Sequence, residues 1–145
     1  MKTEIIVAEN AGFCFGVDRA VKIVYNILRE GKRVVTYGEI IHNRDVTKEL
    51  AAKGVRIADT PEELAALTDE TVVIRSHGAG RDIFRLLEEK GIEYRDGTCP
   101  FVRRIQKIAE EKSAAGYDII IMGDENHPEV RGIASYCHNI PKILK

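Results

Sequence analysis

The chain alternates short runs of β-branched and other apolar residues with longer amphipathic stretches, and this alternation constrains its fold more than any other feature. Short apolar runs fit strands, whereas apolar residues spaced three and four apart fit one face of a helix. An order of strand, helix, strand and helix is typical of α/β proteins with mostly parallel sheets. We therefore predict an α/β fold built from repeated strand–loop–helix units.

The boundaries of the expected elements follow from these patterns. Strands are predicted over residues 4–8, 33–37, 55–57, 71–75, 92–95 and 117–122. Helices are predicted over residues 17–30, 45–53, 61–67, 81–90, 100–115 and 128–136. A glycine follows four of these helical stretches, where a left-handed residue is favoured, and a proline begins three of them, where its fixed φ suits the first turn.

A cysteine or a histidine occupies each of five predicted strand-to-helix loops. In chain order these residues are Cys14, His42, His77, Cys99 and His127. The interval from Cys14 to His42 is 28 positions, and the interval from Cys99 to His127 is the same. A period of 85 positions, from 14 to 99, therefore indicates a duplicated α/β unit. Because ligands of open α/β sheets bind outside the carboxyl ends of the strands, we expect the five loops to open on related faces.

The cysteines are far apart in the sequence, which argues against both a disulfide framework and a local C-x-x-C metal loop. Cys14 and Cys99 each precede a predicted helix, whose dipole favours the thiolate that a metal ligand or a nucleophile needs. The alternative is that both are inert buried cysteines. Cys137 follows the last helix, outside the loop pattern, and is interpreted as structural.

The three loop histidines stand beside small polar residues at predicted helix starts. His42, His77 and His127 in such positions predict an anion site suited to phosphate or diphosphate. Glu129, in the first turn of the helix after His127, is a candidate for proton transfer. The alternatives are that each histidine only caps a helix or satisfies a loop carbonyl, and that Glu129 only complements a helix dipole.

The composition excludes several classes of protein. Hydrophobic residues make up 44% and charged residues 31% of the 145 positions, and the net charge is −1. This balance gives no electrostatic footprint for nucleic acid, and no apolar run is long enough to span a membrane. The N-terminus enters strand-like sequence without the features of a signal peptide, so we expect a cytoplasmic protein.

Five motifs in this order resemble the 4-hydroxy-3-methylbut-2-enyl diphosphate reductase family. They are G-F-C-x-G-V-x-R-A at residues 12–20, H-N at 42–43, S-H-G at 76–78, D-x-T-C-P at 96–100 and H-P-E-V at 127–130. The resemblance implies three α/β domains in a pseudo-threefold ring around one 4Fe–4S cluster. It makes residues 1–96 the first domain and residues 97–145 an incomplete second domain, with residues 1–10 pairing with a third domain.

The resemblance also implies the chemistry and the site. The reaction would be the reductive dehydroxylation of an allylic diphosphate to isopentenyl and dimethylallyl diphosphate, with electrons from a donor such as ferredoxin or flavodoxin. Cys14 and Cys99 would be cluster ligands, and a third cysteine ligand would come from outside this chain. His42 and His77 would contact the diphosphate, His127 would line the pocket, and Glu129 would deliver protons. The chain alone is therefore expected to be inactive.

Two functions from other classes remain open at this point. One is a non-catalytic redox module that uses a cluster or its thiols without turning over a substrate. The other is a zinc-dependent hydrolase that uses the three loop histidines as ligands.

Overall fold

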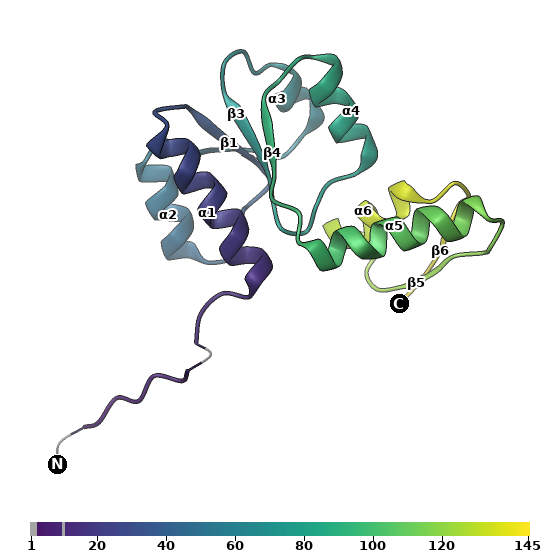
Figure 1. Cartoon of the computed structure of the whole chain (residues 1–145), viewed down its shortest axis with the longest axis horizontal. Coiled ribbons are helices and arrows are strands. Elements are labelled where there is room, and N and C mark those ends of the chain that lie inside the picture. Colours follow the sequence, from purple (N-terminus) through teal and green to yellow (C-terminus); the bar gives the residue numbers. More distant parts are fainter. Residues whose placement is uncertain (1–2, 10) are drawn as a thin grey trace.

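The computed structural model describes residues 3–9 and 11–145, and its helices and strands alternate along the chain (Figure 1). The elements are α1 (Phe15–Arg29), β1 (Val34–Tyr37), α2 (Arg44–Ala52), β2 (Arg56–Ala58), α3 (Pro61–Ala65), β3 (Thr71–Ile74), α4 (Arg81–Glu89), β4 (Tyr94–Asp96), α5 (Pro100–Ala114), β5 (Ile120–Met122), α6 (Pro128–Tyr136) and β6 (Lys142–Leu144). The predicted α/β class with parallel sheets is thus confirmed.

Strands β1 to β4 form one parallel sheet in the order β2-β1-β3-β4. The two central strands are valine-rich because helices cover both faces of this sheet. Alternate residues of β3 enter different cores: Val73 packs with Ala20 and Val24 of α1, whereas Val72 and Ile74 pack on the other face. In Figure 1, α1 and α2 lie on one side of the sheet, and α3 and α4 lie on the other.

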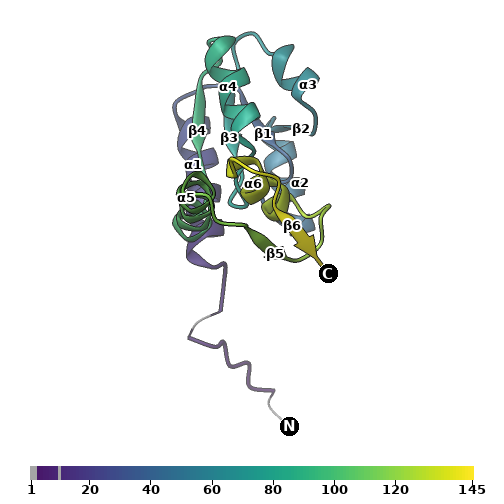
Figure 2. The same ribbon diagram turned by 90° about the vertical axis from the view of Figure 1, so that its right-hand side faces the viewer.

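The second half of the described chain repeats the order of the first. Helices α1 and α5 each contain 15 residues and begin at positions 15 and 100, an offset of 85. Each is followed by a strand, a helix and a second strand, and β5 pairs with β6 in parallel as β1 pairs with β2. Figure 2 shows the two-stranded sheet beside α6, below the four-stranded sheet. The 85-residue period therefore corresponds to a repeated unit of structure.

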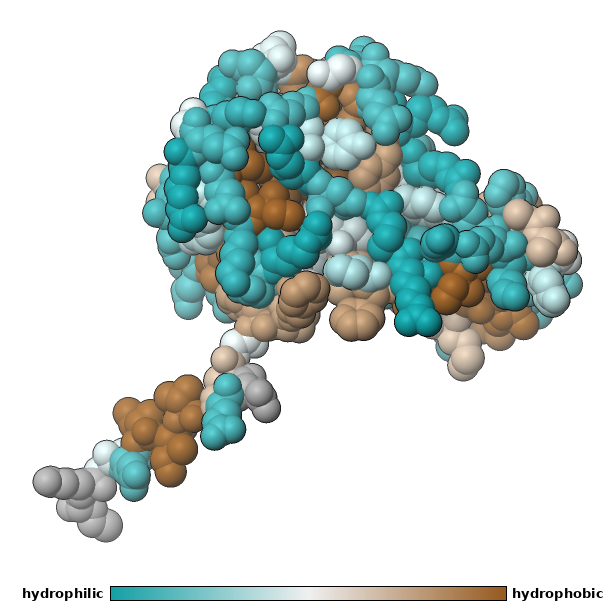
Figure 3. Space-filling model, in the orientation of Figure 1, coloured by the Kyte–Doolittle hydropathy of each residue, from teal (hydrophilic) through white to brown (hydrophobic). Residues whose placement is uncertain are grey.

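The predicted strand over residues 4–8 is wrong. Residues 4–8 have no strand conformation, and Ile5, Ile6 and Val7 are between 75% and 85% exposed. Figure 3 shows them as an apolar cluster on an extended N-terminal segment. A strand is stable only when its backbone pairs with a neighbour, and no described segment pairs with this one. Residues 4–8 have the composition of a strand, but in the described part of the chain they pair with no edge strand of a sheet.

The last strand, β6, was not predicted from the sequence. β6 contains three residues and follows Pro141, so its apolar pattern is too short to distinguish from a loop. Its pairing with β5 makes it a strand. The other predicted strands and helices are present, with ends that differ by up to three residues.

Candidate functional site

Both candidate thiols stand immediately before the first residue of a long helix. Cys14 is the N-cap of α1 and is exposed, and Cys99 is the N-cap of α5 and is half-buried. Neither side chain accepts a hydrogen bond from the helix that it precedes. The helix N–H groups therefore leave both sulfur atoms available for another partner.

A close contact brings the two helix starts together. Gly16, in the first turn of α1, packs directly against Cys99: a Cβ atom built on Gly16 would lie 2.8 Å from the Cβ and 2.8 Å from the Sγ of Cys99. Only glycine permits such an approach without a shift of the neighbour. In the sequence, the glycines that flank Cys14 predict a close approach of the backbone to a bulky neighbour, and the structure identifies the neighbour of Gly16 as Cys99. A glycine two residues after a cysteine, inside a helix, was the available signal.

Polar contacts fix the loop that carries Cys99. The Asp96 carboxylate accepts hydrogen bonds from the Thr98 backbone N–H at 2.9 Å and from the Thr98 hydroxyl at 2.5 Å, and its second oxygen pairs with Arg103. The Gly97 N–H donates to the Ile74 carbonyl at 2.9 Å. The guanidinium of Arg19, from α1, donates to the carbonyls of Asp96 and Thr98. The loop is thus anchored to its own helix, to β3 and to α1.

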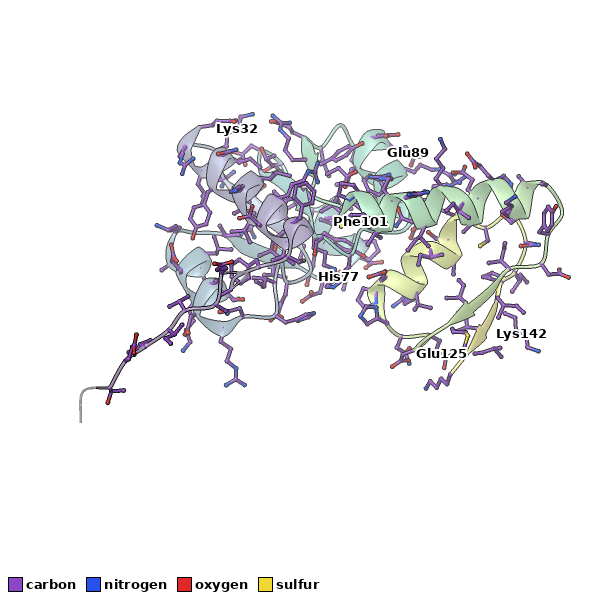
Figure 4. All side chains as sticks on the ribbon, turned by 60° about the horizontal axis from the view of Figure 1, so that its bottom comes forward. Lys32, His77, Glu89, Phe101, Glu125 and Lys142 are labelled. Carbon is purple, nitrogen blue, oxygen red and sulfur yellow. The ribbon has the colours of Figure 1, made fainter. Side chains whose placement is uncertain are left out.

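The three predicted histidines gather in space from three different loops. The ring centroids of His42 and His77 lie 5.8 Å apart, and those of His77 and His127 lie 5.6 Å apart. His77 is half-buried between two exposed neighbours, and Figure 4 shows it in the middle of the molecule, between the α1–α4 half and α6. Sequence positions 42, 77 and 127 therefore contribute to one cluster.

The histidine cluster lies beside the Cys99 loop. The Cys99 backbone N–H donates to the carbonyl of Ser76, next to His77, at 2.9 Å. Gly78, on the other side of His77, packs against Thr98, so that an added Cβ would lie 3.1 Å from the Thr98 methyl. The structure thus brings the predicted thiol and histidine loops to one edge.

The electrostatic surroundings of the histidines differ. Partial burial lowers the pKa of His77, and the positive charge of Arg75 lowers it further, while Glu129 opposes the shift. His77 is therefore neutral near pH 7. His127 accepts a hydrogen bond at Nδ1 from the backbone N–H of Glu129 at 3.2 Å, which leaves its Nε2 to carry the proton of the neutral ring. His42 contacts Glu39 through Nδ1 at 3.2 Å.

Glu129 is half-buried in the first turn of α6. It lines a cavity of about 350 Å³ together with His127 and residues of the β5–α6 loop. Its negative charge raises the pKa of His77, against the lowering by burial and by Arg75. A carboxylate in this place can accept or donate a proton next to an anion held by the histidines.

A cleft lined by charged residues was not predicted. It encloses about 710 Å³ at the carboxyl ends of β1 and β3 and is closed by α6. Charged residues of both signs line it: Arg75, Arg81, Arg85 and Arg131 with Asp59, Glu62 and Asp82. Because Arg81 is paired with Glu110 at 2.5 Å, the remaining charges balance, and the cleft favours neither cations nor anions.

The described residues fit a metal centre only in part. Gly16, two residues after Cys14, packs against Cys99. The exposed aromatic rings of Phe13, Phe15 and Phe101 stand next to the two cysteines in the sequence. Cys137 ends α6 instead: its half-buried thiol points to the Ile133 carbonyl at 3.8 Å, and burial raises its pKa. Within residues 3–9 and 11–145, no group of three His, Cys, Asp or Glu side chains is placed to hold a metal ion.

Known proteins are similar to this chain in sequence and in fold. A reductase named 4-hydroxy-3-methylbut-2-enyl diphosphate reductase, from Caldanaerobacter subterraneus subsp. tengcongensis, is 49% identical over 143 residues, which are 97% of this chain and 50% of that protein. A solved structure of (E)-4-hydroxy-3-methyl-but-2-enyl diphosphate reductase, described as the terminal enzyme of the non-mevalonate pathway, matches with a TM-score of 0.82 and 37% identity, over 97% of this chain and 50% of that one.

The reductase structure from Plasmodium falciparum matches with a TM-score of 0.85 and 28% identity, over 94% of this chain and 43% of that one. The chain thus spans about half the length of the curated relatives that it matches. None of its described helices is long and apolar enough to cross a membrane. The family model described as "LytB protein" matches residues 5–144, and the chain therefore belongs to the LytB protein family.

Proposed function

We propose that this chain forms part of a 4-hydroxy-3-methylbut-2-enyl diphosphate reductase. Such an enzyme consumes a pair of electrons and a pair of protons, breaks the allylic C–O bond, forms a C–H bond and releases the oxygen as water. The products are isopentenyl and dimethylallyl diphosphate. The observation that carries the proposal is the hydrogen bond from Cys99 to Ser76, which joins a thiol loop to the histidine cluster. The names of the relatives support the same reaction.

Cys14 and Cys99 are the residues that would hold an iron–sulfur cluster of the 4Fe–4S type. Their thiols meet the chemical requirement for iron ligation, and the Gly16 contact brings their helices together. Such a cluster would supply electrons and a Lewis-acidic iron to the substrate hydroxyl. A third thiolate would come from outside the described residues, since Cys137 is turned toward its own helix.

The histidine cluster is the proposed diphosphate site. His42 and His77 would donate N–H groups to phosphate oxygens, and His127 would present its Nε2–H to the same cavity. A neutral His77 donates one hydrogen bond without requiring a counter-charge, so binding would persist above the ordinary pKa of histidine. Glu129 would deliver the proton that the departing hydroxyl needs.

The domain division and the partners are part of this proposal. Residues 1–96 would form the first domain, because the four-stranded sheet ends at Asp96, and residues 97–145 would begin the second. The N-terminal ten residues would pair with a third domain; residues 3–9 are exposed, and residues 1, 2 and 10 lie outside the described residues. A ferredoxin or a flavodoxin would supply electrons in the cytoplasm. The chain alone would lack turnover.

The two other classes of function have less support. A zinc hydrolase needs three converging ligands, and the described side chains contain no such group. A non-catalytic redox module needs the thiols but gives no reason for three histidines to gather beside them.

Anaerobic reconstitution tests the proposal. The 145-residue chain and a chain extended to the length of the relatives are treated with iron and sulfide, and iron, sulfide and the visible spectrum are measured. Turnover is then assayed with dithionite and a viologen mediator. We expect a cluster and turnover in the extended chain, loss of both in Cys14→Ser and Cys99→Ser, and retention of both in Cys137→Ser. Zinc without sulfide, or a cluster without turnover in the extended chain, contradicts the reductase assignment.

A further inference from the structure

Arg19 makes two hydrogen bonds that cross most of the first unit. Its Nη1 donates to the Thr98 carbonyl at 3.1 Å, and its Nη2 donates to the Asp96 carbonyl at 3.1 Å. The partners are separated from Arg19 by 79 and 77 positions in the sequence, and both contacts are partly buried. A guanidinium group is planar and carries several N–H donors in a fixed fork, so it can hold two carbonyls in one geometry.

The two carbonyls belong to the turn that leads into Cys99. Within that turn, Asp96 holds the N–H and hydroxyl of Thr98, and Arg103 of α5 holds Asp96. These contacts set the shape of the turn but not its place relative to α1. In the part of the chain that the structure describes, the hydrogen bonds that join α1 to the turn are those of Arg19.

Because Arg19 lies on α1, its hydrogen bonds affect the distance between the loops that carry Cys14 and Cys99. Arg19 lies on the same helix as Gly16, whose backbone packs against Cys99, and Cys14 begins that helix. The Gly16 contact is steric, and it therefore limits how closely the start of α1 and the Cys99 turn can approach each other. The Arg19 bonds act in the opposite sense, because they hold the Cys99 turn onto α1. Together they fix the distance between the two helix starts.

We propose that Arg19 is a positioning residue that holds the Cys99 loop against the first turn of α1, so that the thiols of Cys14 and Cys99 face one ligand before it binds. This inference rests on the proposed function in that the ligand would be the iron–sulfur cluster. The positioning itself is a property of the metal-free chain. Arg19 touches neither thiol through a hydrogen bond, so its effect on iron ligation passes through the backbone of residues 96–98.

The test measures the geometry of the two thiols without iron. Every protein carries Cys137→Ser, which leaves Cys14 and Cys99 as the remaining thiols. A short bismaleimide measures the rate of intramolecular cross-linking, and a monofunctional maleimide measures the reactivity of each thiol alone, both by mass spectrometry. The variants are Arg19→Ala and Arg19→Lys. Arg29→Ala is the matched control, because Arg29 lies on the same helix and, among the described residues, its side chain hydrogen-bonds to the exposed Asn26 alone.

Arg19→Ala is expected to lower the cross-linking rate about tenfold relative to the monofunctional rates, because the effective concentration of one thiol at the other falls. Arg19→Lys should fall nearly as far, since a single ammonium cannot span both carbonyls. Arg29→Ala should match the parent. An unchanged cross-linking rate in Arg19→Ala overturns the proposal. So does a parallel fall of both rates with a lower melting temperature, which would make Arg19 a residue of general stability.

The same variants separate this inference from the proposed function. Iron and sulfide uptake is measured on the extended chain with and without Arg19→Ala. If the unsubstituted extended chain takes up no cluster while Arg19→Ala still lowers the cross-linking rate, the reductase proposal fails and the positioning role stands. If the cluster forms equally well in both proteins and cross-linking is unchanged, the positioning role fails and the reductase proposal stands.

Discussion

Replacing Gly16 with alanine perturbs the contact on which the arrangement of the two thiol loops depends. The new methyl carbon would lie 2.8 Å from the Cβ and the Sγ of Cys99, and 3.7 Å from its Cα. Non-bonded carbon atoms settle at about 3.5–4.0 Å, so Cys99 or the start of α1 must move by roughly 1 Å. The Cys99 side chain is short and its backbone is bonded to Ser76, so it has little freedom to move away.

The net effect on stability is the difference between two terms. Overpacking of a well-packed site typically costs about 1–3 kcal/mol. Alanine in place of glycine in a helix recovers up to about 1 kcal/mol, and less in the first turn. We therefore expect a net loss of about 1–2 kcal/mol, which corresponds to a fall in Tm of roughly 2–8 °C for a chain of this size.

Gly132→Ala is the matched control, because Gly132 lies inside α6 and an added Cβ would meet its nearest atom at 3.5 Å, an ordinary contact. That variant should gain about 0.5–1 kcal/mol from helix propensity alone. Thermal unfolding followed by far-UV circular dichroism compares the two, and the bismaleimide assay reports the distance between the thiols. If Gly16→Ala is as stable as Gly132→Ala and cross-links normally, the close contact does not position Cys99.

Three other predictions concern single residues. His77→Gln should weaken the pH dependence of stability: the pKa of folded His77 is lowered, mainly by burial, so the unfolded chain binds the proton more readily and stability falls as pH drops below about 6.5. Equal urea midpoint shifts between pH 7 and pH 5 in variant and parent would refute this. Asn43→Ala removes the acceptor for the Asp45 and Val46 N–H groups and should cost about 1 kcal/mol in urea denaturation; no loss would mean that Asn43 does not cap α2. In the extended chain, Glu129→Gln should keep the cluster and substrate binding but lose most turnover, and near-normal turnover would leave Glu129 as a helix-dipole residue.

Local signals predicted most of the fold. Pro100 and Pro128 begin α5 and α6 at the predicted positions, because a proline suits the first turn and needs no N–H partner. Gly31 and Gly116, both with positive φ, follow α1 and α5 as expected. The positions of His42, His77, Cys99 and His127 before helices were also predictable, since each follows a strand with a parallel neighbour. Cys14 also precedes a helix, but no described strand comes before it.

Contacts between distant segments could not be predicted in this way. Nothing in the sequence near Arg19 indicates that its partners are the carbonyls of Asp96 and Thr98. The pattern of residues 4–8 suits a strand, but a strand also needs an edge, which local sequence does not reveal. The 710 Å³ cleft likewise arises where α6 meets the ends of β1 and β3, so it exists only in the assembled structure.

The two long helices show that the burial of a side chain depends on the element that its helix packs against, and not only on the pattern of apolar residues in the helix. At the offset of 85 positions, Ala20 of α1 corresponds to Ile105 of α5; Ala20 is fully buried, whereas Ile105 is 45% exposed. Helix α1 packs on β1 and β3 of the first sheet, and α5 packs mainly on α6. Small residues in the first turns of α1, such as Gly16 and Ala20, allow its backbone to approach the Cys99 loop. The larger residues of α5 would prevent such an approach at its own start. The repeated unit therefore places the two thiols alike, while the small residues that bring them together occur in the first copy.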